Sequence, residues 1–328
     1  MQLLGYIVRR LFYGALLMLA VIVLNFLLIR LAPGDPAVVI AGEMGGATEE
    51  ILNSMRAEYG LDQPLFTQLA IYLGQIAHGN LGESYYWNRP VTYLIGLKIW
   101  QTILLVIAAQ VIAIFLGTVM GVLAARKPQG VVSGVVAVVS TVGYALPVFW
   151  TGLMLIILFA SMIPVFPIEG MYSARFEGGW FAYMLDVLHH LVLPATTLAI
   201  IFLAFYARLA RASMIDVLGA DFVRTARAKG VPEMRVVFKH ALRNAVLPII
   251  TVAGLQFGNL ISGALLVETV FNWPGMGTLA FESILRRDYP TAMGVLIFSA
   301  AMVVVANIVT DLAYRLADPR IRTGGARS

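Results

Sequence analysis

The chain has 328 residues, of which 60% are hydrophobic and only 12% are charged, whereas soluble domains have about 45–50% apolar and about 25% charged residues. A soluble fold could not cover so much apolar surface, so the composition predicts a membrane protein and excludes a cytosolic enzyme or a disordered chain. The absence of cysteine excludes disulfides and thiolate metal sites, and the net charge of +5 is carried at predicted membrane boundaries.

Six apolar stretches are long enough to cross a bilayer, which requires about 20 residues in a helix. The third contains Pro147, and we interpret it as one kinked or tilted helix because two crossings would each be too short. The sequence therefore predicts an all-α membrane protein with six transmembrane helices at Leu11–Ile29, Ile99–Ala125, Val131–Ile163, Leu188–Ala207, Leu247–Val267 and Thr291–Ala313.

Most of the 23 Lys and Arg residues lie on one side of this arrangement. They precede the first stretch, follow the second, crowd the segment between the fourth and fifth, and recur in the tail. Since cytoplasmic loops carry an excess of basic residues, this pattern predicts that both termini are inside (N-in/C-in).

The predicted spans divide the chain into three parts. Residues 1–32 are expected to hold the N-terminus and first span, 33–98 a helical cap on the outer side, and 99–328 a core domain with the other five spans. In the cap, one helix is expected between Thr48 and Gly60 and a second from Asp62 and Pro64. This cap is either a docking surface on the outer side or a cover that only shields the bundle.

The cytoplasmic segment 208–247 predicts a helix–turn–helix elbow. Asp221 can cap a helix over Phe222–Lys229 that ends at Gly230, and Pro232 suits the first turn of a second helix. In that second helix the apolar residues Met234, Val237, Phe238, Ala241, Leu242 and Ala245 share one face, and Arg235, Lys239 and Arg243 share another. An interfacial helix that binds anionic headgroups and a docking site for a cytoplasmic protein both fit this pattern.

Several stretches resemble a known family. Arg224-Thr225-Ala226, Gly230 and His240-Ala241-Leu242-Arg243 keep the spacings of the "EAA…G…I-x-L-P" loop of bacterial ABC-importer permeases, with Arg224 at the acidic position and Arg243 at the proline position. The chain is similar to the B-type subunit of the dipeptide/oligopeptide/nickel group in further stretches, namely Arg30–Pro36, Tyr59–Pro64, Asn80–Ser84, Phe271–Gly277, Arg287–Pro290 and Asp318–Arg322.

The resemblance implies a permease subunit that is not itself an enzyme. Such a subunit pairs with a second homologous permease at the bacterial inner membrane, and each permease seats its loop in a groove on one of two P-loop ATPase subunits, which bind ATP and Mg. Substrate comes from a periplasmic or lipid-anchored binding protein. The implied cargo is a peptide or similar small solute. The residues expected in the ATPase-coupling loop are Asp221, Arg224, Thr225, Ala226, Lys229, Gly230, Val231, Pro232, His240, Leu242 and Arg243.

Two further groups of residues are candidates for contact with substrate or binding protein. Uncharged polar residues within the spans suit either pathway lining or interhelical hydrogen bonds, namely Gln110, Gln256, Asn259, Ser262 and Asn307. Aromatic residues on the outer side suit either docking of the binding protein or an interfacial belt, namely Tyr85, Tyr86, Trp87 and Trp273.

Other functions have weaker support in the sequence. There is no GxxxxGK[ST] loop, no HExxH and no GxSxG, and the adjacent His189 and His190 are expected on different helix faces, so neither a cofactor nor a metal is expected on this chain. A nickel permease remains an alternative within the same family. An ion-coupled secondary transporter would need an ionisable residue in mid-span, and a membrane scaffold would explain the elbow without a pathway.

Overall fold

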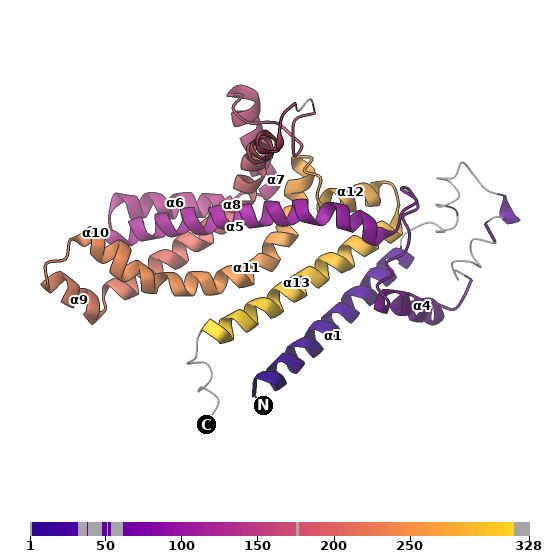
Figure 1. Ribbon diagram of the computed structural model, residues 1–328, viewed down its shortest axis with the longest axis horizontal. Coiled ribbons are helices and arrows are strands. Elements are labelled where there is room, and N and C mark those ends of the chain that lie inside the picture. Colours follow the sequence, from indigo (N-terminus) through magenta and orange to yellow (C-terminus); the bar gives the residue numbers. More distant parts are fainter. Residues whose placement is uncertain are drawn as a thin grey trace. The chain divides into compact units, whose positions relative to one another are not determined.

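The computed structural model describes residues 2–31, 38, 48–50, 52–53, 62–174 and 177–317. Throughout these residues the regular structure is helical, and the only β-type pairing among them is an isolated bridge between Glu83 and Pro90. The all-α prediction is therefore confirmed for the described part of the chain (Figure 1). Its helices are α1 (Gln2–Leu31), α4 (Leu65–Ala77), α5 (Val91–Arg126), α6 (Val131–Ala145), α7 (Val148–Ile156), η1 (Ile157–Met162), α8 (Trp180–Leu218), α9 (Asp221–Ala228), α10 (Glu233–Arg235), η2 (Val236–Ala241), α11 (Leu242–Val270), α12 (Met276–Leu285) and α13 (Tyr289–Ala317).

Five of the six predicted spans coincide with long apolar helices. The described residues contain five helices long and apolar enough to cross a membrane, and six if a bent pair is taken as one span. The helices extend well beyond the apolar runs that predicted them, because backbone hydrogen bonding continues into the polar flanks. α8, for example, covers 39 residues.

The third predicted span is broken into two parts, of which the first is α6 and the second is α7 followed by the π-helical turn η1. The two parts are bent by 106°, which is far more than the kink or tilt we expected. Pro147 adopts an extended backbone conformation (φ −60°, ψ 137°) at the N-cap of α7, and Leu146 is also extended. Because proline has no N–H for the helical ladder and disfavours helix at the preceding residue, the chain turns here.

Packing divides the chain into two units, which are described separately. The first comprises residues 1–100 and 275–308. Its core lies where the start of α5 meets α12 and α13, around Val91, Ile95, Leu279 and Val295. The cap helix expected after Asp62 is α4, with Pro64 at its N-cap, whereas the cap helix expected from Thr48 to Gly60 lies largely outside the described residues.

In this first unit, α1 and α4 are connected to α13 by polar contacts at one residue. Asn25 Nδ2 donates a hydrogen bond to the Met293 carbonyl oxygen at 3.3 Å, and the Tyr72 hydroxyl donates to Met293 Sδ at 3.2 Å. Burial raises the pKa of the Tyr72 phenol, since the ionised form loses its hydration. Tyr72 is therefore a neutral hydrogen-bond donor in this position.

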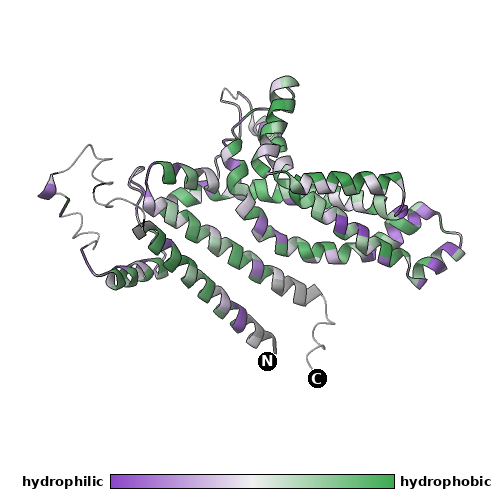
Figure 2. Cartoon of the chain, turned by 180° about the vertical axis from the view of Figure 1, so that it is seen from behind, coloured by the Kyte–Doolittle hydropathy of each residue, from purple (hydrophilic) through white to green (hydrophobic). Residues whose placement is uncertain are grey.

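The second unit comprises residues 101–274 and 309–328, and α8 is its central helix. α8 packs against α6, α7 and α11 (Figure 1). The hydropathy colouring shows mostly hydrophobic surfaces on α6 and α7 and a concentration of polar residues around α9 and α10 (Figure 2). The polar elbow thus lies at one end of an apolar helical bundle.

Close contact between α5 and α8 depends on two glycines. A Cβ atom at Gly121 would lie 2.5 Å from the Ala207 carbonyl oxygen, and one at Gly117 would lie 2.7 Å from Tyr206 Cβ. Real Cβ atoms essentially never approach so closely, so these positions require glycine. Glycines four residues apart thus allow these two helices to approach closely.

Candidate functional site

The turn of the predicted elbow has the geometry expected of a glycine-terminated helix. Gly230 has φ +73°, its N–H bonds to the Arg227 carbonyl at 2.9 Å, and the Val231 N–H bonds to the Ala226 carbonyl at 3.2 Å. This pair of bonds satisfies the last carbonyls of α9 and is the Schellman arrangement. The prediction of a helix that stops at Gly230 is confirmed, although α9 itself ends at Ala228 and Lys229 is its C-cap.

The start of α9 differs from the prediction. Ala220 is the N-cap, Asp221 is already the first helical residue, and no side-chain cap bond forms. The Asp221 carboxylate instead lies 3.5 Å from the Arg224 guanidinium. Asp221 therefore stabilises α9 because its negative charge lies in the first turn, near the positive end of the helix dipole, and not because it caps the helix.

The second arm is not a separate amphipathic helix. Pro232 is the N-cap of α10, and the chain continues from α10 through the π-helical turn η2 directly into α11. The wider π turn rotates the register, so Val236 is buried while Met234 and Phe238 are 55% and 40% exposed. The predicted apolar face is therefore wrong at Met234 and Phe238 and correct at Val237, Ala241 and Ala245.

An ion pair joins the two arms. Arg227 Nη2 and Nε donate to the two oxygens of Glu233 at 2.8 and 3.1 Å. This bidentate pairing holds the pKa of the Glu233 carboxyl below its usual range and raises the pKa of Arg227. Both side chains are about half exposed, so the pair fixes the geometry of the turn more than it adds stability.

Buried valines anchor the elbow while its predicted coupling residues face outward. Val223 and Val236 are fully buried where α9 packs on η2. Ala226, Val231, His240 and Leu242 are half-buried. The other predicted coupling residues are exposed, namely Asp221, Arg224, Thr225, Lys229, Gly230, Pro232 and Arg243. The result is a turn packed on buried valines, and the charged side chains on its exposed surface are mostly basic.

Gln110 connects three helices of the second unit. Its Nε2 donates to the Tyr206 hydroxyl at 3.0 Å and to the Ala253 carbonyl at 2.8 Å, thereby bridging α5, α8 and α11. With an exposed fraction of 9%, Gln110 serves as an interhelical hydrogen-bonding group and not as part of an open pathway surface. Of the two roles we considered for it, the structure supports the structural one.

The remaining candidate lining residues are more accessible. On α11, Asn259 and Ser262 are exposed and Gln256 is half-buried, with Asn259 Nδ2 donating to Gln256 Oε1 at 2.6 Å. Asn307 of α13 is half-buried. These four residues stay candidates for pathway lining.

The outer aromatic residues do not form one accessible group. Trp273 is fully buried and its indole Nε1 donates to the Gln101 carbonyl at 3.0 Å, so its side chain is not part of the exposed surface. In the first unit, Tyr85 and Trp87 are half-buried and Tyr86 is 41% exposed. The guanidinium of Arg286 stacks 3.8 Å from the Tyr86 ring centroid, which makes this pair an accessible cationic and aromatic surface.

A buried carboxylate in the first unit was missed from the sequence. Asp288 is 2% exposed and accepts hydrogen bonds from Ser84 Oγ at 2.5 Å, from Thr291 Oγ1 at 2.8 Å and from the Tyr85 N–H at 3.2 Å. Ser84 and Asp288 belong to two of the stretches that carried the family resemblance. That shared membership was the available signal that these distant segments meet.

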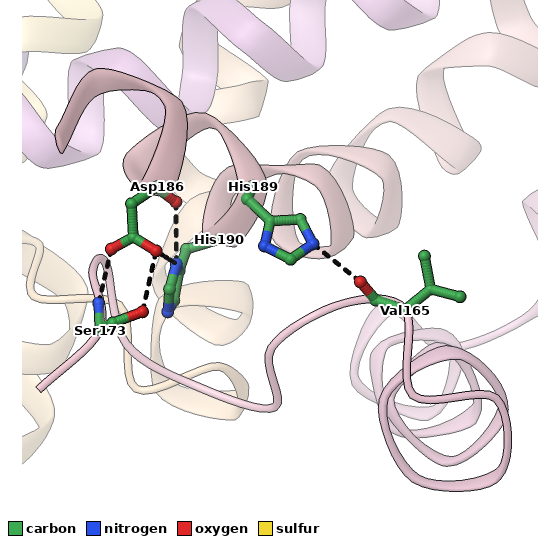
Figure 3. Close-up of polar contacts among 5 residues, drawn as sticks. All are labelled: Val165, Ser173, Asp186, His189 and His190. Atoms are coloured by element: carbon green, nitrogen blue, oxygen red, sulfur yellow. Dashed lines mark hydrogen bonds and ion pairs between the residues drawn. The ribbon is translucent and has the colours of Figure 1, made fainter. Parts of the chain in front are cut away.

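His189 and Asp186 of α8 bond the segment that precedes this helix, whereas His190 bonds within α8 (Figure 3). His189 Nε2 donates to the Val165 carbonyl at 2.7 Å, and His190 Nδ1 lies 2.8 Å from the Asp186 carbonyl. The Asp186 carboxylate accepts bonds from the N–H and hydroxyl of Ser173 at 2.6 and 2.8 Å. The two imidazoles face different partners, and within the described ranges no three His, Asp or Glu residues are grouped as a metal site would require.

Comparison with known proteins decides the family. Residues 117–323 match the family described as "Binding-protein-dependent transport system inner membrane component", and residues 3–92 match its N-terminal counterpart. The chain belongs to this family. It is a permease subunit of a binding-protein-dependent importer.

Curated relatives align with this permease over nearly its whole length. The "Probable peptide ABC transporter permease protein y4tP" of Sinorhizobium fredii is 42% identical, the di/tripeptide transport system permease protein DppB of Pseudomonas aeruginosa 41%, and the oligopeptide transport system permease protein AppB of Bacillus subtilis 38%. Each alignment covers 97% of this chain and 99% of the relative. The relatives are thus named as permeases, in agreement with the sequence resemblance.

A solved transporter shares the fold. The MetNI methionine ABC transporter, in an inward-facing crystal form, superimposes with a TM-score of 0.54 at 16% identity, covering 69% of this permease and 97% of that chain. At this level of identity the likeness concerns the fold alone.

Proposed function

We propose that this permease carries di- and oligopeptides, or similar small solutes, into the cytoplasm of a bacterium. The observation that carries the proposal is the near full-length likeness to relatives named for peptide, di/tripeptide and oligopeptide transport. The candidate lining residues of α11, namely Gln256, Asn259 and Ser262, are uncharged, which suits a pathway for peptides of varied charge because a fixed charge would retain some peptides and repel others.

The importer would contain further subunits. A second homologous permease completes the pathway, two P-loop ATPases bind ATP and Mg, and a substrate-binding protein delivers the peptide. The permease itself has no catalytic role and spans the inner membrane six times, N-in and C-in, with α6, α7 and η1 as one broken span. The basic residues around α9 and α10 support this orientation.

The elbow formed by α9, α10 and η2 would transmit the ATPase cycle. Its exposed residues enter a groove on an ATPase subunit, and the buried valines and the Arg227–Glu233 pair make the elbow move as one body. Because the second arm runs without interruption into α11, a displacement of the elbow rotates or tilts that helix directly. This is rigid-body transmission through a packed element.

The outer face of the first unit would meet the binding protein. Tyr86 with its stacked Arg286, flanked by Tyr85 and Trp87, supplies an aromatic and cationic surface. On the pathway side, the proposed lining residues are Gln256, Asn259, Ser262 and Asn307.

Co-purification from the native host tests this proposal. The permease is tagged and solubilised in a mild detergent, and the recovered proteins are identified by mass spectrometry. We expect a second six-span permease and two P-loop ATPases. Recovery of the tagged chain alone, or only as a homo-oligomer under several mild detergents, would contradict it.

A further inference from the structure

An arginine and a tyrosine form an exposed pair between α6 and α8. The guanidinium carbon of Arg208 lies 5.3 Å from the centroid of the Tyr144 ring, within the range of a cation–π interaction. Both side chains are exposed, Tyr144 by 62%. Neither residue belongs to the elbow formed by α9, α10 and η2, and neither was among the candidates from the sequence.

The Arg208 guanidinium has no anionic partner in the described part of the chain. Its polar and ring interactions there are limited to the Tyr144 ring, and no carboxylate of the described residues lies within ion-pair distance of it. The neighbouring Arg211 differs, because its Nε donates to Ser133 Oγ at 3.1 Å and its Nη2 to the Pro128 carbonyl at 3.2 Å. Arg211 thus connects helices, whereas the donors of Arg208 are available for an anion.

In the proposed orientation, Arg208 lies at the inner boundary of the membrane. The preceding stretch, Leu188–Ala207, has no Asp, Glu, Lys or Arg, and its length of about 30 Å equals the hydrocarbon thickness of a bilayer. One turn further along α8, Arg211 bonds to the turn between α5 and α6, which follows Arg126 and contains Lys127. An apolar stretch on one side and basic residues on the other mark a membrane boundary.

Tyr144 lies further along α6, but its ring reaches back toward this boundary. α6 and α8 are antiparallel, since Ser133 lies beside Arg211 and Gly143 beside Ile200. Side chains of an α-helix lean toward its N-terminus, which for α6 is the end at the inner boundary. The Tyr144 ring therefore leans toward the boundary and meets the guanidinium that leans toward it from α8. This contact holds the guanidinium against the ring.

The exposed surface of α6 beyond the boundary suits lipid. Apart from Thr141 and Tyr144, every exposed residue of α6 is valine, alanine or glycine, and Figure 2 shows this apolar surface. The Thr141 hydroxyl donates to the Ala137 carbonyl of the same helix at 2.8 Å, as a polar group must where no water is available. Lipid phosphates line such a boundary throughout, whereas a protein carboxylate would have to be brought to it by another subunit.

We propose that Arg208 and Tyr144 bind the phosphate of an anionic phospholipid in the inner leaflet. The planar guanidinium can donate two parallel hydrogen bonds to phosphate oxygens, while the acyl chains lie along the exposed apolar surface of α6. Three further cations at the same boundary, Arg126, Lys127 and Arg211, favour a headgroup with net negative charge over a zwitterionic one. The site goes beyond the proposed peptide function, because it requires only that α8 crosses the bilayer in the proposed orientation.

Lipid binding by the purified permease tests this site. The tagged permease is purified in detergent with the subunits that accompany it, its lipids are removed, and native mass spectrometry measures how much phosphatidylglycerol rebinds. Wild type is compared with Arg208→Gln at equal lipid concentrations. Arg235→Gln, which removes one exposed arginine from the elbow, is the matched control for the loss of a charge.

We expect Arg235→Gln to bind phosphatidylglycerol as wild type does. Arg208→Gln should bind it about fivefold more weakly, which is the contribution of one basic residue at an anionic membrane surface. Equal binding by Arg208→Gln and wild type, or equal loss in the two glutamine variants, would overturn the proposal.

Two further variants separate a binding site from general surface charge. Arg208→Lys keeps the charge but loses the planar fork of donors, and Tyr144→Leu keeps the arginine but removes the ring that holds it. Both should bind phosphatidylglycerol more weakly than wild type. Wild-type affinity in both variants would assign the effect to surface charge alone and would overturn the site.

Other ligands test which anion the site takes. Phosphatidylcholine with the same acyl chains should bind wild type more weakly than phosphatidylglycerol and should lose less affinity in Arg208→Gln. Inorganic phosphate should not displace phosphatidylglycerol, because it lacks the acyl chains, and displacement would contradict the lipid assignment. Loss of an accompanying subunit from Arg208→Gln with unchanged lipid binding would also overturn the proposal, in favour of a carboxylate on a partner protein.

Discussion

Gly230 holds a backbone conformation that other residues adopt only with strain. Its φ of +73° lies in the left-handed region, although a Cβ there would meet no atom within 4 Å. The requirement for glycine is therefore conformational and not steric, and a substitution costs about 1–2 kcal/mol in this region, with asparagine among the tolerated exceptions.

This distinction predicts different outcomes for two variants. Gly230→Val should distort the turn and lower the number of peptides imported per ATP hydrolysed, while membrane insertion is retained. Gly230→Asn, which is of similar bulk, should keep most of the coupling. Uptake and ATP hydrolysis measured together in proteoliposomes check this, and normal coupling in Gly230→Val would refute the role of the turn.

Gly121 requires glycine for a different reason, because the backbone of α8 occupies the space of a side chain. Gly121→Ala should force α5 and α8 apart and destabilise the protein by about 1–3 kcal/mol. Gly96→Ala on the same helix, where nothing lies within 4 Å, should be neutral or stabilising by up to about 1 kcal/mol. Thermal unfolding in detergent distinguishes them, and equal midpoints would contradict the packing argument.

The carboxylate of Asp288 depends on its buried donors. Ser84→Ala removes the shortest of its hydrogen bonds and should destabilise the first unit by about 1–3 kcal/mol, since a buried group loses a partner. The adjacent, exposed Glu83→Ala should have little effect. Protease resistance of the outer segments measures the difference, and equal resistance of the two variants would count against this role of Ser84.

At the scale of elements, the two arms of the elbow are coupled by the Arg227–Glu233 pair. A double-mutant cycle with Arg227→Gln and Glu233→Gln should give a coupling energy of about 0.2–1 kcal/mol at neutral pH, small because both side chains are half exposed. The pairing lowers the pKa of Glu233, so its contribution is present above the unfolded pKa and is lost as pH falls through the folded value. A coupling that persisted well below about pH 4 would contradict the ionic origin.

A comparison of the predicted spans with the helices of the structure shows which elements the sequence alone can predict. Sustained apolar runs located five spans, because a bilayer demands about 20 apolar residues. Hydropathy could not show how far α8 continues past its apolar run, nor that Pro147 would turn the chain by 106° instead of kinking a helix. The π turn η2 could not be predicted either, because apolar residues at α-helical spacing do not indicate that one turn contains an extra residue.

The role of a site residue could be predicted where it depends on the local backbone conformation. It could not be predicted where it depends on tertiary contacts. Glycine at 230 could be recognised from its place between two helical patterns. The burial of Trp273, the bridging by Gln110 and the contact of Asp288 with Ser84 each depend on a distant segment. No local pattern in one sequence contains that information.

At the scale of the whole molecule, the central claim is that ATP hydrolysis on partner subunits drives peptide movement through this permease. The continuous helix from α10 through η2 into α11 would provide the physical connection for the proposed coupling. The most direct test is uptake of a labelled dipeptide into proteoliposomes that contain the full importer, with the binding protein outside and ATP inside. The account predicts accumulation that requires ATP, the binding protein and this permease together; uptake that proceeds without ATP, or that follows an ion gradient instead, would contradict it.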